Sequence, residues 1–515
     1  MLKKLRILLA SLVLVASILF FIDFSNALPS WLHIFQDVQL VPSFLAKRFF
    51  LVGAILLATL LLGRIYCSVI CPLGIFQDLL GRIYLRFNKK RHFRYIKEHK
   101  ILKWSFLAIF LFSFFLNVSF LVGLLEPYSI FGRIFTHIFS PVYLLLNNML
   151  AYGFNFMGNY SLYRMDVYII SLSALIVALL SLLLITVMTY KSGRLFCNTL
   201  CPVGTFLGFI SKYSFFKVRF AKDKCNSCGL CARACKASCI NSNTHEIDYA
   251  SCVDCYNCLY VCKKNALAYT CKIPSNNSNA VAKNKEPKDA MAISNPSRRS
   301  FFTISSMTLV SAASTKAQDV QTRLARKEKI VKLPIIPPGG KSFQHLAKHC
   351  TSCHLCVAKC PTRAIKPSLM EYGMAGVMLP MMTYDKGFCN FDCTLCSEIC
   401  PTNALQKISK EEKHHLKIGD VKFLLELCIV YTDNTSCGAC SEHCPTQAVS
   451  MIDYKDGLTI PYIEQDICVG CGGCESICPS IPQKAIYIEG FDTHKLAQAV
   501  EKKDTEEVDL DGFGF

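Results

Sequence analysis

Cysteine spacing constrains the fold of this chain more than any other feature. Thirty cysteines occur among its 515 residues, and most of them stand in short, regular runs. Two neighbouring runs have the spacing C-x2-C-x2-C-x3-C: Cys225, Cys228, Cys231 and Cys235, then Cys252, Cys255, Cys258 and Cys262. This spacing is typical of domains that bind two 4Fe–4S clusters, in which the fourth cysteine of each run ligates the cluster of the other run. The sequence therefore predicts one cluster on Cys225, Cys228, Cys231 and Cys262, and another on Cys252, Cys255, Cys258 and Cys235.

Zinc and disulfide bonds are the alternatives for cysteines at this density. Zinc ribbons use two cysteine pairs that lie far apart, whereas each run here places four cysteines within eleven residues. Disulfide-dense chains are small secreted domains, which a chain of this length does not resemble. Cluster ligation is the interpretation that fits the spacing best.

The C-terminal half contains four more runs of four cysteines. Their members are Cys350, Cys353, Cys356, Cys360; Cys389, Cys393, Cys396, Cys400; Cys428, Cys437, Cys440, Cys444; and Cys468, Cys471, Cys474, Cys478. Each run ends in Cys-Pro, and the long gap before Cys437 makes Cys428 the least regular member. Six runs predict six 4Fe–4S clusters, which carry single electrons, so the expected function is electron transfer. Cys239 and Cys271 lie outside every motif and are expected to be bystanders.

The N-terminal part is predicted to be an α-helical membrane bundle, because the mean hydropathy of the chain is +0.33. The candidate transmembrane helices are Ile7–Ile22, Phe49–Ile65, Leu102–Leu125 and Val167–Tyr190. The third and fourth have the ~20 residues that a bilayer requires, and the first two need flanking residues to span it. Phe135–Met157 is apolar but interrupted by Pro141, Asn147, Asn148 and Gly153, so we expect it to lie in the interface on the outer face, and a fifth membrane span is the alternative.

Basic residues indicate the orientation of this bundle. The formal charge is +19, and residues 63–103 hold ten Lys or Arg residues, whereas residues 23–43 hold none. The positive-inside rule then places the N-terminus, residues 63–103 and the segment after Tyr190 in the cytoplasm. No aromatic-basic motif of a nucleic-acid module is visible, so we expect no nucleic-acid partner.

A repeated phrase follows the second and fourth predicted helices. It reads GRIYCSVICPLGIF at Gly63–Phe76 and GRLFCNTLCPVGTF at Gly193–Phe206. The two helices run in the same direction, so the two motifs are expected to face one another on the cytoplasmic side. We expect each helix to continue to its proline, Pro72 or Pro202, and to end there, so that Cys67 and Cys71 share one face, and so do Cys197 and Cys201. We therefore predict a shared thiol site, either metal-binding or redox-active, with Arg64 and Arg194 favouring thiolates; independent packing cysteines are the alternative.

A segment that resembles an export signal lies inside the chain. The segment SRRSFF, at Ser297–Phe302, opens a mildly apolar stretch in an otherwise polar linker. Arg298 and Arg299 followed by this stretch are typical of a twin-arginine export signal. A signal of this kind, uncleaved or cleaved, would carry the folded C-terminal half across the membrane.

With these features, the chain resembles two accessory ferredoxins of periplasmic nitrate reduction joined end to end. Residues 1–271 resemble the NapH family, and residues 297–490 resemble the NapG family and its relative MauM. The resemblance implies the electron-transfer component of a quinol dehydrogenase in the bacterial inner membrane. Quinol would be the electron donor, and the partner would be a periplasmic cytochrome c or a reductase of nitrate or nitrous oxide.

The resemblance to four-cluster ferredoxins also implies a pairing of the C-terminal runs. The outer runs would exchange their fourth ligands, which joins Cys350, Cys353 and Cys356 to Cys478, and Cys468, Cys471 and Cys474 to Cys360. The inner runs would do the same, which joins Cys389, Cys393 and Cys396 to Cys444, and Cys428, Cys437 and Cys440 to Cys400.

The expected fold is thus a four-helix membrane domain followed by α+β ferredoxin-like domains. Its parts are residues 1–212 (membrane domain), 213–271 (two-cluster ferredoxin), 272–340 (linker with the signal), 341–490 (four-cluster ferredoxin) and 491–515 (acidic tail). The membrane would separate two cytoplasmic clusters from four periplasmic ones, with a quinol as the carrier between them. His137 and Glu126 are candidate proton acceptors, although a structural role suits them too. A redox maturation factor for a metalloenzyme and a membrane-tethered cytoplasmic relay are the alternative functions.

Overall fold

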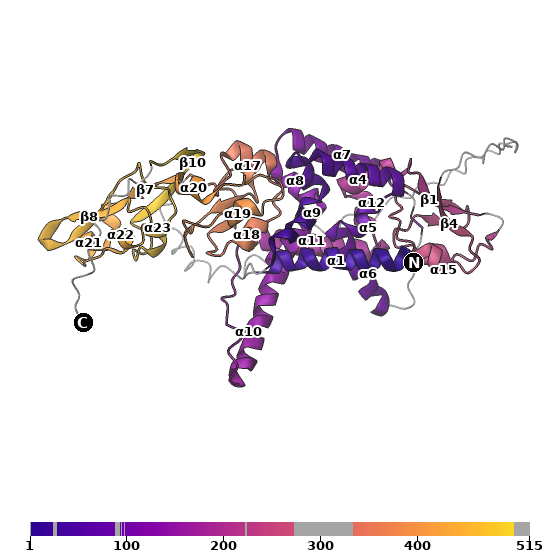
Figure 1. The fold of residues 1–515 in the computed structure, drawn as a ribbon, viewed down its shortest axis with the longest axis horizontal. Coiled ribbons are helices and arrows are strands. Elements are labelled where there is room, and N and C mark those ends of the chain that lie inside the picture. The colour runs from indigo at the N-terminus through magenta and orange to yellow at the C-terminus, as the bar shows by residue number, and fades with distance from the viewer. Residues whose placement is uncertain are drawn as a thin grey trace, which may run out of the picture. The chain divides into compact units, whose positions relative to one another are not determined.

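The computed structural model describes residues 2–23, 28–87, 93, 95–96, 98–221, 224–271 and 333–498. A helical region comes first in the chain, and it is followed by two regions of short helices and two-stranded sheets (Figure 1). This order agrees with the predicted fold class. The predicted signal at Arg298 and Arg299 lies outside the described residues.

The helical region contains both long and short helices. Its longer elements are α1 (Leu2–Ile22), α4 (Phe49–Leu62), α6 (Pro72–Phe87), α7 (Lys100–Phe115), α8 (Ser119–Leu125), α9 (Pro127–Ile134), α10 (Ser140–Phe156), α11 (Leu172–Ser192) and α13 (Pro202–Ser211). Shorter ones are η1 (Ser30–His33), α2 (Ile34–Asp37), α3 (Leu40–Leu45), α5 (Tyr66–Val69), η2 (Phe135–Phe139) and α12 (Leu195–Thr199).

The prediction of four membrane spans at the stated positions is not confirmed. Among the described residues, three helices are long and apolar enough to cross a membrane: Leu2–Ile22, Pro127–Phe156 and Leu172–Ser192. The predicted span Leu102–Leu125 is divided into α7 and α8, because Asn117 adopts a left-handed backbone conformation between them. Helix α4 has only 14 residues and ends at Gly63, where φ is +80°.

The segment that we expected to lie in the membrane interface, Phe135–Met157, belongs for all but its last residue to a continuous helical path of 30 residues, Pro127–Phe156. Pro141 does not break this path, because the π-helical turn η2 precedes it and Pro141 stands in the first turn of α10, where a missing N–H is tolerated. Figure 1 shows α10 leaving the other helices of the region. Its interfacial placement stays a prediction.

The first α+β region follows α13 directly. It contains β1 (Phe216–Phe220), α14 (Leu230–Arg233), β2 (Ile240–Asn241), β3 (Glu246–Ile247), α15 (Asn257–Val261) and β4 (Leu267–Cys271). Strand β1 pairs antiparallel with β4, so that Phe216 stands opposite Cys271 and Phe220 opposite Leu267. This pairing joins the two ends of the region and encloses both cysteine runs between them.

The second α+β region is also built from short helices and two-stranded antiparallel sheets. Its helices are α17 (Phe343–His349), α18 (Leu355–Lys359), η4 (Met374–Gly376), α19 (Leu395–Glu398), α20 (Lys410–His414), η5 (Leu425–Leu427), α21 (Ile429–Thr432), α22 (Ala439–Glu442), η6 (Lys455–Gly457) and α23 (Gly473–Ile477). Its antiparallel pairs are β5 (Ile365–Pro367) with β6 (Pro380–Met382), β8 (Val449–Asp453) with β9 (Thr459–Ile463), and β7 (Leu416–Phe423) with β10 (Ile486–Leu496).

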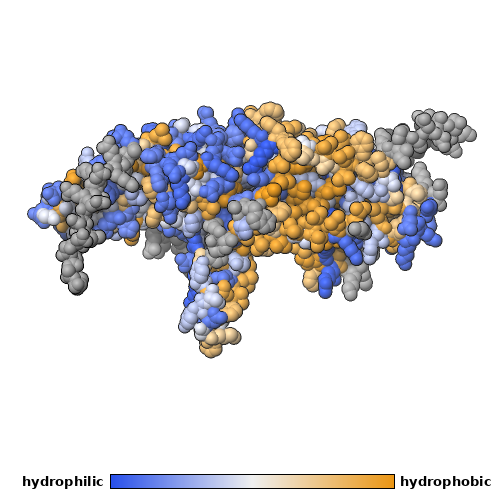
Figure 2. Space-filling model, in the orientation of Figure 1, coloured by the Kyte–Doolittle hydropathy of each residue, from blue (hydrophilic) through white to orange (hydrophobic). Residues whose placement is uncertain are grey.

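The surfaces of these regions differ in polarity. Large apolar side chains are exposed along the helical region, including Phe112, Phe115 and Leu180 at 66%, 78% and 60%. Figure 2 shows hydrophobic residues gathered over α4 and α7 and hydrophilic residues over the β-containing part near β7 and β8. An apolar outer surface on helices is what a membrane-embedded region requires.

Candidate iron–sulfur sites

The first α+β region brings its eight motif cysteines together in two sets of four. One cavity is lined by Cys225, Cys228, Cys231 and Cys262, and a second by Cys235, Cys252, Cys255 and Cys258. Cys239, which we expected to be a bystander, also lines the second cavity, and its Sγ lies 3.4 Å from that of Cys235. Each set contains three cysteines of one run and the fourth cysteine of the other run, which is the exchange that the spacing predicts. The second cavity is the more enclosed, because Cys235, Cys255 and Cys258 are all buried.

The second α+β region also groups its cysteines, but with a different pairing from the one that the resemblance implied. One cavity is lined by Cys350, Cys353, Cys356 and Cys400, and another by Cys428, Cys437, Cys440 and Cys478. Cys360 lies near Cys389 and Cys396, and Cys444 lies near Cys468, Cys471 and Cys474. The expected outer–outer and inner–inner exchange is therefore wrong.

Local packing explains the correction. Helix α18 of the first run packs on α19 of the second, and α22 of the third packs on α23 of the fourth. The first and second runs thus form one two-cluster unit, and the third and fourth runs form another. The two runs of the first α+β region are paired in the same way. Exchange of the fourth ligand then takes place inside each unit.

These cysteine sets fit a cubane cluster. Backbone N–H groups point at several of the sulfurs, with Ser352 N to Cys350 Sγ at 3.3 Å and Ala266 N to Cys262 Sγ at 3.3 Å. Four thiolates with N–H donors to sulfur are the usual surroundings of a 4Fe–4S cluster.

The repeated phrase folds as a break between helices and not as a helix end. In the first copy, α5 stops before Ile70 and Pro72 opens α6; in the second, α12 stops before Leu200 and Pro202 opens α13. Our expectation that each helix continues to its proline, which then ends it, is wrong. Proline suits the first position of a helix, where no N–H is needed.

The two copies nevertheless face one another, and each arginine reaches into the other copy. Arg64 donates from Nη2 to the Cys197 carbonyl oxygen at 3.3 Å, and Arg194 donates from Nη1 to the Cys67 carbonyl oxygen at 2.7 Å. Both guanidinium groups are fully buried, and the four cysteines are 3–4% exposed. The reciprocal contacts hold Cys67, Cys71, Cys197 and Cys201 in one place, which we call the four-cysteine site.

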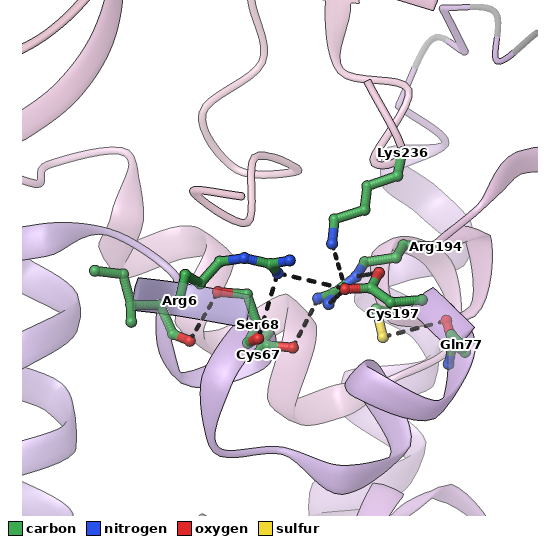
Figure 3. A network of polar contacts seen from close by, with 9 residues as sticks. Arg6, Cys67, Ser68, Gln77, Arg194, Cys197 and Lys236 are labelled. Carbon is green, nitrogen blue, oxygen red and sulfur yellow. Dashed lines mark hydrogen bonds and ion pairs between the residues drawn. The ribbon is translucent and has the colours of Figure 1, made fainter. Parts of the chain in front are cut away.

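A buried carboxylate organises the same region. Asp78 on α6 accepts from Arg194 Nη2 at 2.7 Å and from Arg6 Nη1 at 3.4 Å, and it also binds Lys236 (Figure 3). Burial alone would raise the pKa of Asp78, but Arg194 and Lys236 outweigh it and lower this pKa below its usual range. Burial lowers the pKa of Lys236 to about 8. This ion network fastens the first α+β region to the helical region.

The expectation that the two arginines favour a thiolate is not supported for Cys197 as a free thiol. Burial raises the pKa of Cys197 to about 11, although Arg194 and Arg64 both act to lower it. The Cys197 thiol instead donates to Gln77 Oε1 at 3.5 Å. A thiolate at this position therefore needs a further stabilising partner.

The second α+β region contacts the helical region through its first cysteine run. Arg133 Nη1 donates to the Ser352 carbonyl oxygen at 3.3 Å, and His137 Nε2 lies 2.7 Å from His354 Nδ1. Lys359 pairs with Asp23 at 2.7 Å, one residue beyond the end of α1. Ser352 and His354 flank Cys353, so the cluster site containing Cys353 adjoins the helices directly. Lys359 flanks Cys360, which belongs to the neighbouring site.

The two α+β regions contact opposite ends of α1. At its first turns, Lys3 lies 4.2 Å from the Tyr260 ring centroid and Arg6 joins the Asp78 network. At its last turn, Phe20 and Phe21 lie beside the contact with Lys359 and the α9 aromatic residues. Helix α1 spans 21 residues, which is about 31 Å, the thickness of the hydrocarbon core of a bilayer.

Several of these residues carry no sequence signal. Arg133, His354 and Lys236 are ordinary polar residues in the sequence, and only the fold brings them to the contacts. Asp78 could have been noticed, because residues 63–103 contain just two acidic residues, Asp78 and Glu98, among ten basic ones. Glu126 caps α9 by accepting from Ser129 N, which is a structural role.

Comparisons with known proteins support iron–sulfur domains in the helical region and in the second α+β region. A family described as "4Fe-4S binding domain" matches residues 44–94 and 174–222, and two families described as "4Fe-4S dicluster domain" match residues 435–481 and 349–405. The first match covers both copies of the repeated phrase. No solved structure matches the chain.

Individual relatives are distant. The putative electron transport protein YccM of Escherichia coli is 25% identical over 47% of this chain and 61% of its own length. The ferredoxin-type protein NapF of Escherichia coli is 25% identical over 30% of this chain and 85% of its own length. The uncharacterized protein MJ0749 of Methanocaldococcus jannaschii is 35% identical, but the chain spans only 40% of that protein's length. The chain is a ferredoxin-type iron–sulfur electron-transfer protein with a helical N-terminal region.

Proposed function

We propose that this protein is a fusion of a NapH-like membrane ferredoxin with a NapG-like four-cluster ferredoxin, which oxidises quinol and passes the electrons to an exported reductase system. Quinol is lipid-soluble and releases two electrons and two protons, and each cluster accepts one electron at a time. The contact between the helices and the Cys353 cluster site supports this proposal, because it combines acid–base side chains with a one-electron acceptor.

The polar groups at that contact suit a quinol better than they suit packing alone. The Tyr128 hydroxyl, the Thr136 hydroxyl and Arg133 Nε are buried and have no hydrogen-bond partner among the described residues. They stand on α9 and η2, beside the His137–His354 pair. Buried polar atoms without partners are costly, so a ligand that offers two oxygen atoms to such a site would be stabilised.

The arrangement along α1 supports a transmembrane orientation. If α1 spans the bilayer, the two α+β regions lie on opposite sides, because they contact its opposite ends. The positive-inside rule then predicts that the two-cluster ferredoxin lies on the cytoplasmic side of a bacterial inner membrane and the four-cluster ferredoxin on the periplasmic side. A periplasmic cytochrome c or reductase would be the partner of the latter.

Substitution of His137 tests the quinol proposal. We expect His137→Gln to lower the rate of quinol-dependent cluster reduction by about 100-fold, because it removes the proton acceptor at the contact. Reduction by dithionite should be unchanged. The rate is measured in proteoliposomes by the bleaching of cluster absorbance after addition of a reduced quinone analogue.

The matched control is His99→Gln, since His99 is exposed and lies at the start of α7. Equal rates in the His137→Gln, control and unsubstituted proteins would contradict quinol oxidation at this contact. Normal quinol oxidation combined with a cofactor-free reductase in a deletion strain would instead favour a maturation factor.

A further inference from the structure

We propose that Cys67, Cys71, Cys197 and Cys201 together ligate one additional iron–sulfur cluster, held between the two repeats of the helical region. Two cysteines come from each copy, and the arginine of each copy binds the backbone of the other. Arg64 Nη2 lies 3.8 Å from Cys67 Sγ and 3.3 Å from the Cys197 carbonyl oxygen, so the cysteine segments of the two copies share one buried neighbourhood. The site therefore offers the four-sulfur ligand set that a cluster needs.

The charges around the site favour an anion. Arg64 is fully buried, and among the described residues its guanidinium forms no ion pair, although the buried Asp254 carboxylate beside the Arg64 backbone attracts it. Its donors go to Asn198, to the Ala250 and Cys197 carbonyl oxygens and to Cys67 Sγ at 3.8 Å. A buried guanidinium without a counter-ion is strongly unfavourable. An anionic cluster with thiolate ligands supplies that counter-ion, whereas four neutral packing thiols do not.

The local hydrogen bonds resemble those of the predicted ferredoxin sites. Gly204 N donates to Cys201 Sγ at 3.3 Å, as Ser352 N does to Cys350 Sγ. Gly74 and Gly204, three residues after the second cysteine of each copy, leave no room for a Cβ, because one would collide with the Cys67 or Cys197 carbonyl oxygen. Both glycines thus let the chain pack tightly around the site.

The position of the site gives the cluster a role. The backbone of the first α+β region binds the second copy, through Arg194 N to the Lys236 carbonyl oxygen at 3.0 Å and Asn198 Nδ2 to the Ala237 carbonyl oxygen at 3.1 Å. Toward the second α+β region, Phe76 on α6 lies next to the site, and its ring centroid is 6.3 Å from that of Phe131. The next residue, Gly132, packs so close to the Cys353 backbone that a Cβ at this position would collide with the Cys353 carbonyl oxygen.

One continuous buried core contains all of these groups, from Cys255 and Cys258 through the four-cysteine site to Phe131, with Cys353 packed against it. A cluster here would accept one electron from one ferredoxin region and pass one to the other, with no bond made and no proton moved. The two ferredoxin regions contact α1 near Arg6 and near Phe21, which are about 22 Å apart along the helix. The cluster would divide this distance into two shorter electron-transfer steps. The relay role rests on the proposed electron-transfer function, but the binding of iron does not.

The test is a cluster count on the full chain, purified anaerobically in detergent. Native mass spectrometry should find seven clusters per chain, and six would overturn the proposal. Cys67→Ser and Cys197→Ser should each lose the same two to four iron atoms and one redox-active signal in electron paramagnetic resonance. The double substitution should lose no more than either single one, because one shared site is lost once.

Cys271→Ser is the matched control, since Cys271 is exposed and belongs to no motif. It should retain the full iron content. Unchanged iron and sulfide in both single variants would leave the packing interpretation in place, as would losses that add across the two copies. Failure of quinol oxidation alone, with seven clusters present, would count against the proposed function and not against this site.

Discussion

Replacement of Asp78 by Asn is expected to destabilise the attachment of the first α+β region by about 3–5 kcal/mol, because it leaves buried cations without their shared carboxylate. Asp78 binds Arg6, Arg194 and Lys236, which come from α1, from the second repeat and from the first α+β region. Its pKa lies below the usual range, so the full contribution is present at neutral pH. Hydrogen exchange of residues 213–271 and the temperature at which cluster absorbance is lost are the measurements.

Asp385→Asn provides the control for that substitution. The Asp385 side chain is 81% exposed and lies 3.9 Å from Lys366, so its loss should change stability by less than about 1 kcal/mol. Equal effects of the two substitutions would show that the Asp78 network does not hold the region in place.

Substitution of Arg298 and Arg299 together by Lys is expected to abolish export of the C-terminal ferredoxin. The twin-arginine pathway recognises the arginine pair itself, and its function is to carry folded, cofactor-loaded domains. The helical region should remain in the membrane, because its insertion depends on its own apolar helices. A C-terminal reporter that is active only outside the cytoplasm measures the effect.

Substitution of the nearby Arg323 and Arg326 by Lys is the matched control and should leave the reporter active. Export of the doubly substituted protein, or export of the unsubstituted protein in a strain without the twin-arginine pathway, would refute the signal. Such a result would favour a cytoplasmic relay tethered to the membrane.

Short-range spacing predicted most of what the candidate sites contain. The exchange of Cys235 and Cys262 follows from two adjacent runs, because ligands that are close in sequence leave the chain few other ways to surround a cubane. The pairing of the C-terminal runs could not be obtained in this way. It depends on which helices pack together, and the analogy placed Cys400 and Cys478 with the wrong partners.

Helix boundaries were the less predictable part of the helical region. Hydropathy marks an apolar stretch but not the backbone geometry inside it, so the break at Asn117 was missed. Proline was interpreted as a stop at Pro72, whereas it starts α6, because the same missing N–H suits both positions. The contacts of His354 and Lys359 with the helices are tertiary, and no local pattern encodes them.

The relay role of the four-cysteine site requires that electrons cross between the two ferredoxin regions through this one chain. Fully reduced protein in sealed, right-side-out vesicles can be exposed to ferricyanide, a one-electron oxidant that does not cross the membrane. We predict that the clusters of both regions become oxidised, and that Cys67→Ser confines oxidation to the clusters of residues 341–490. If the clusters on Cys225–Cys262 stay reduced in the unsubstituted protein while the outer ones are oxidised, the relay role is contradicted.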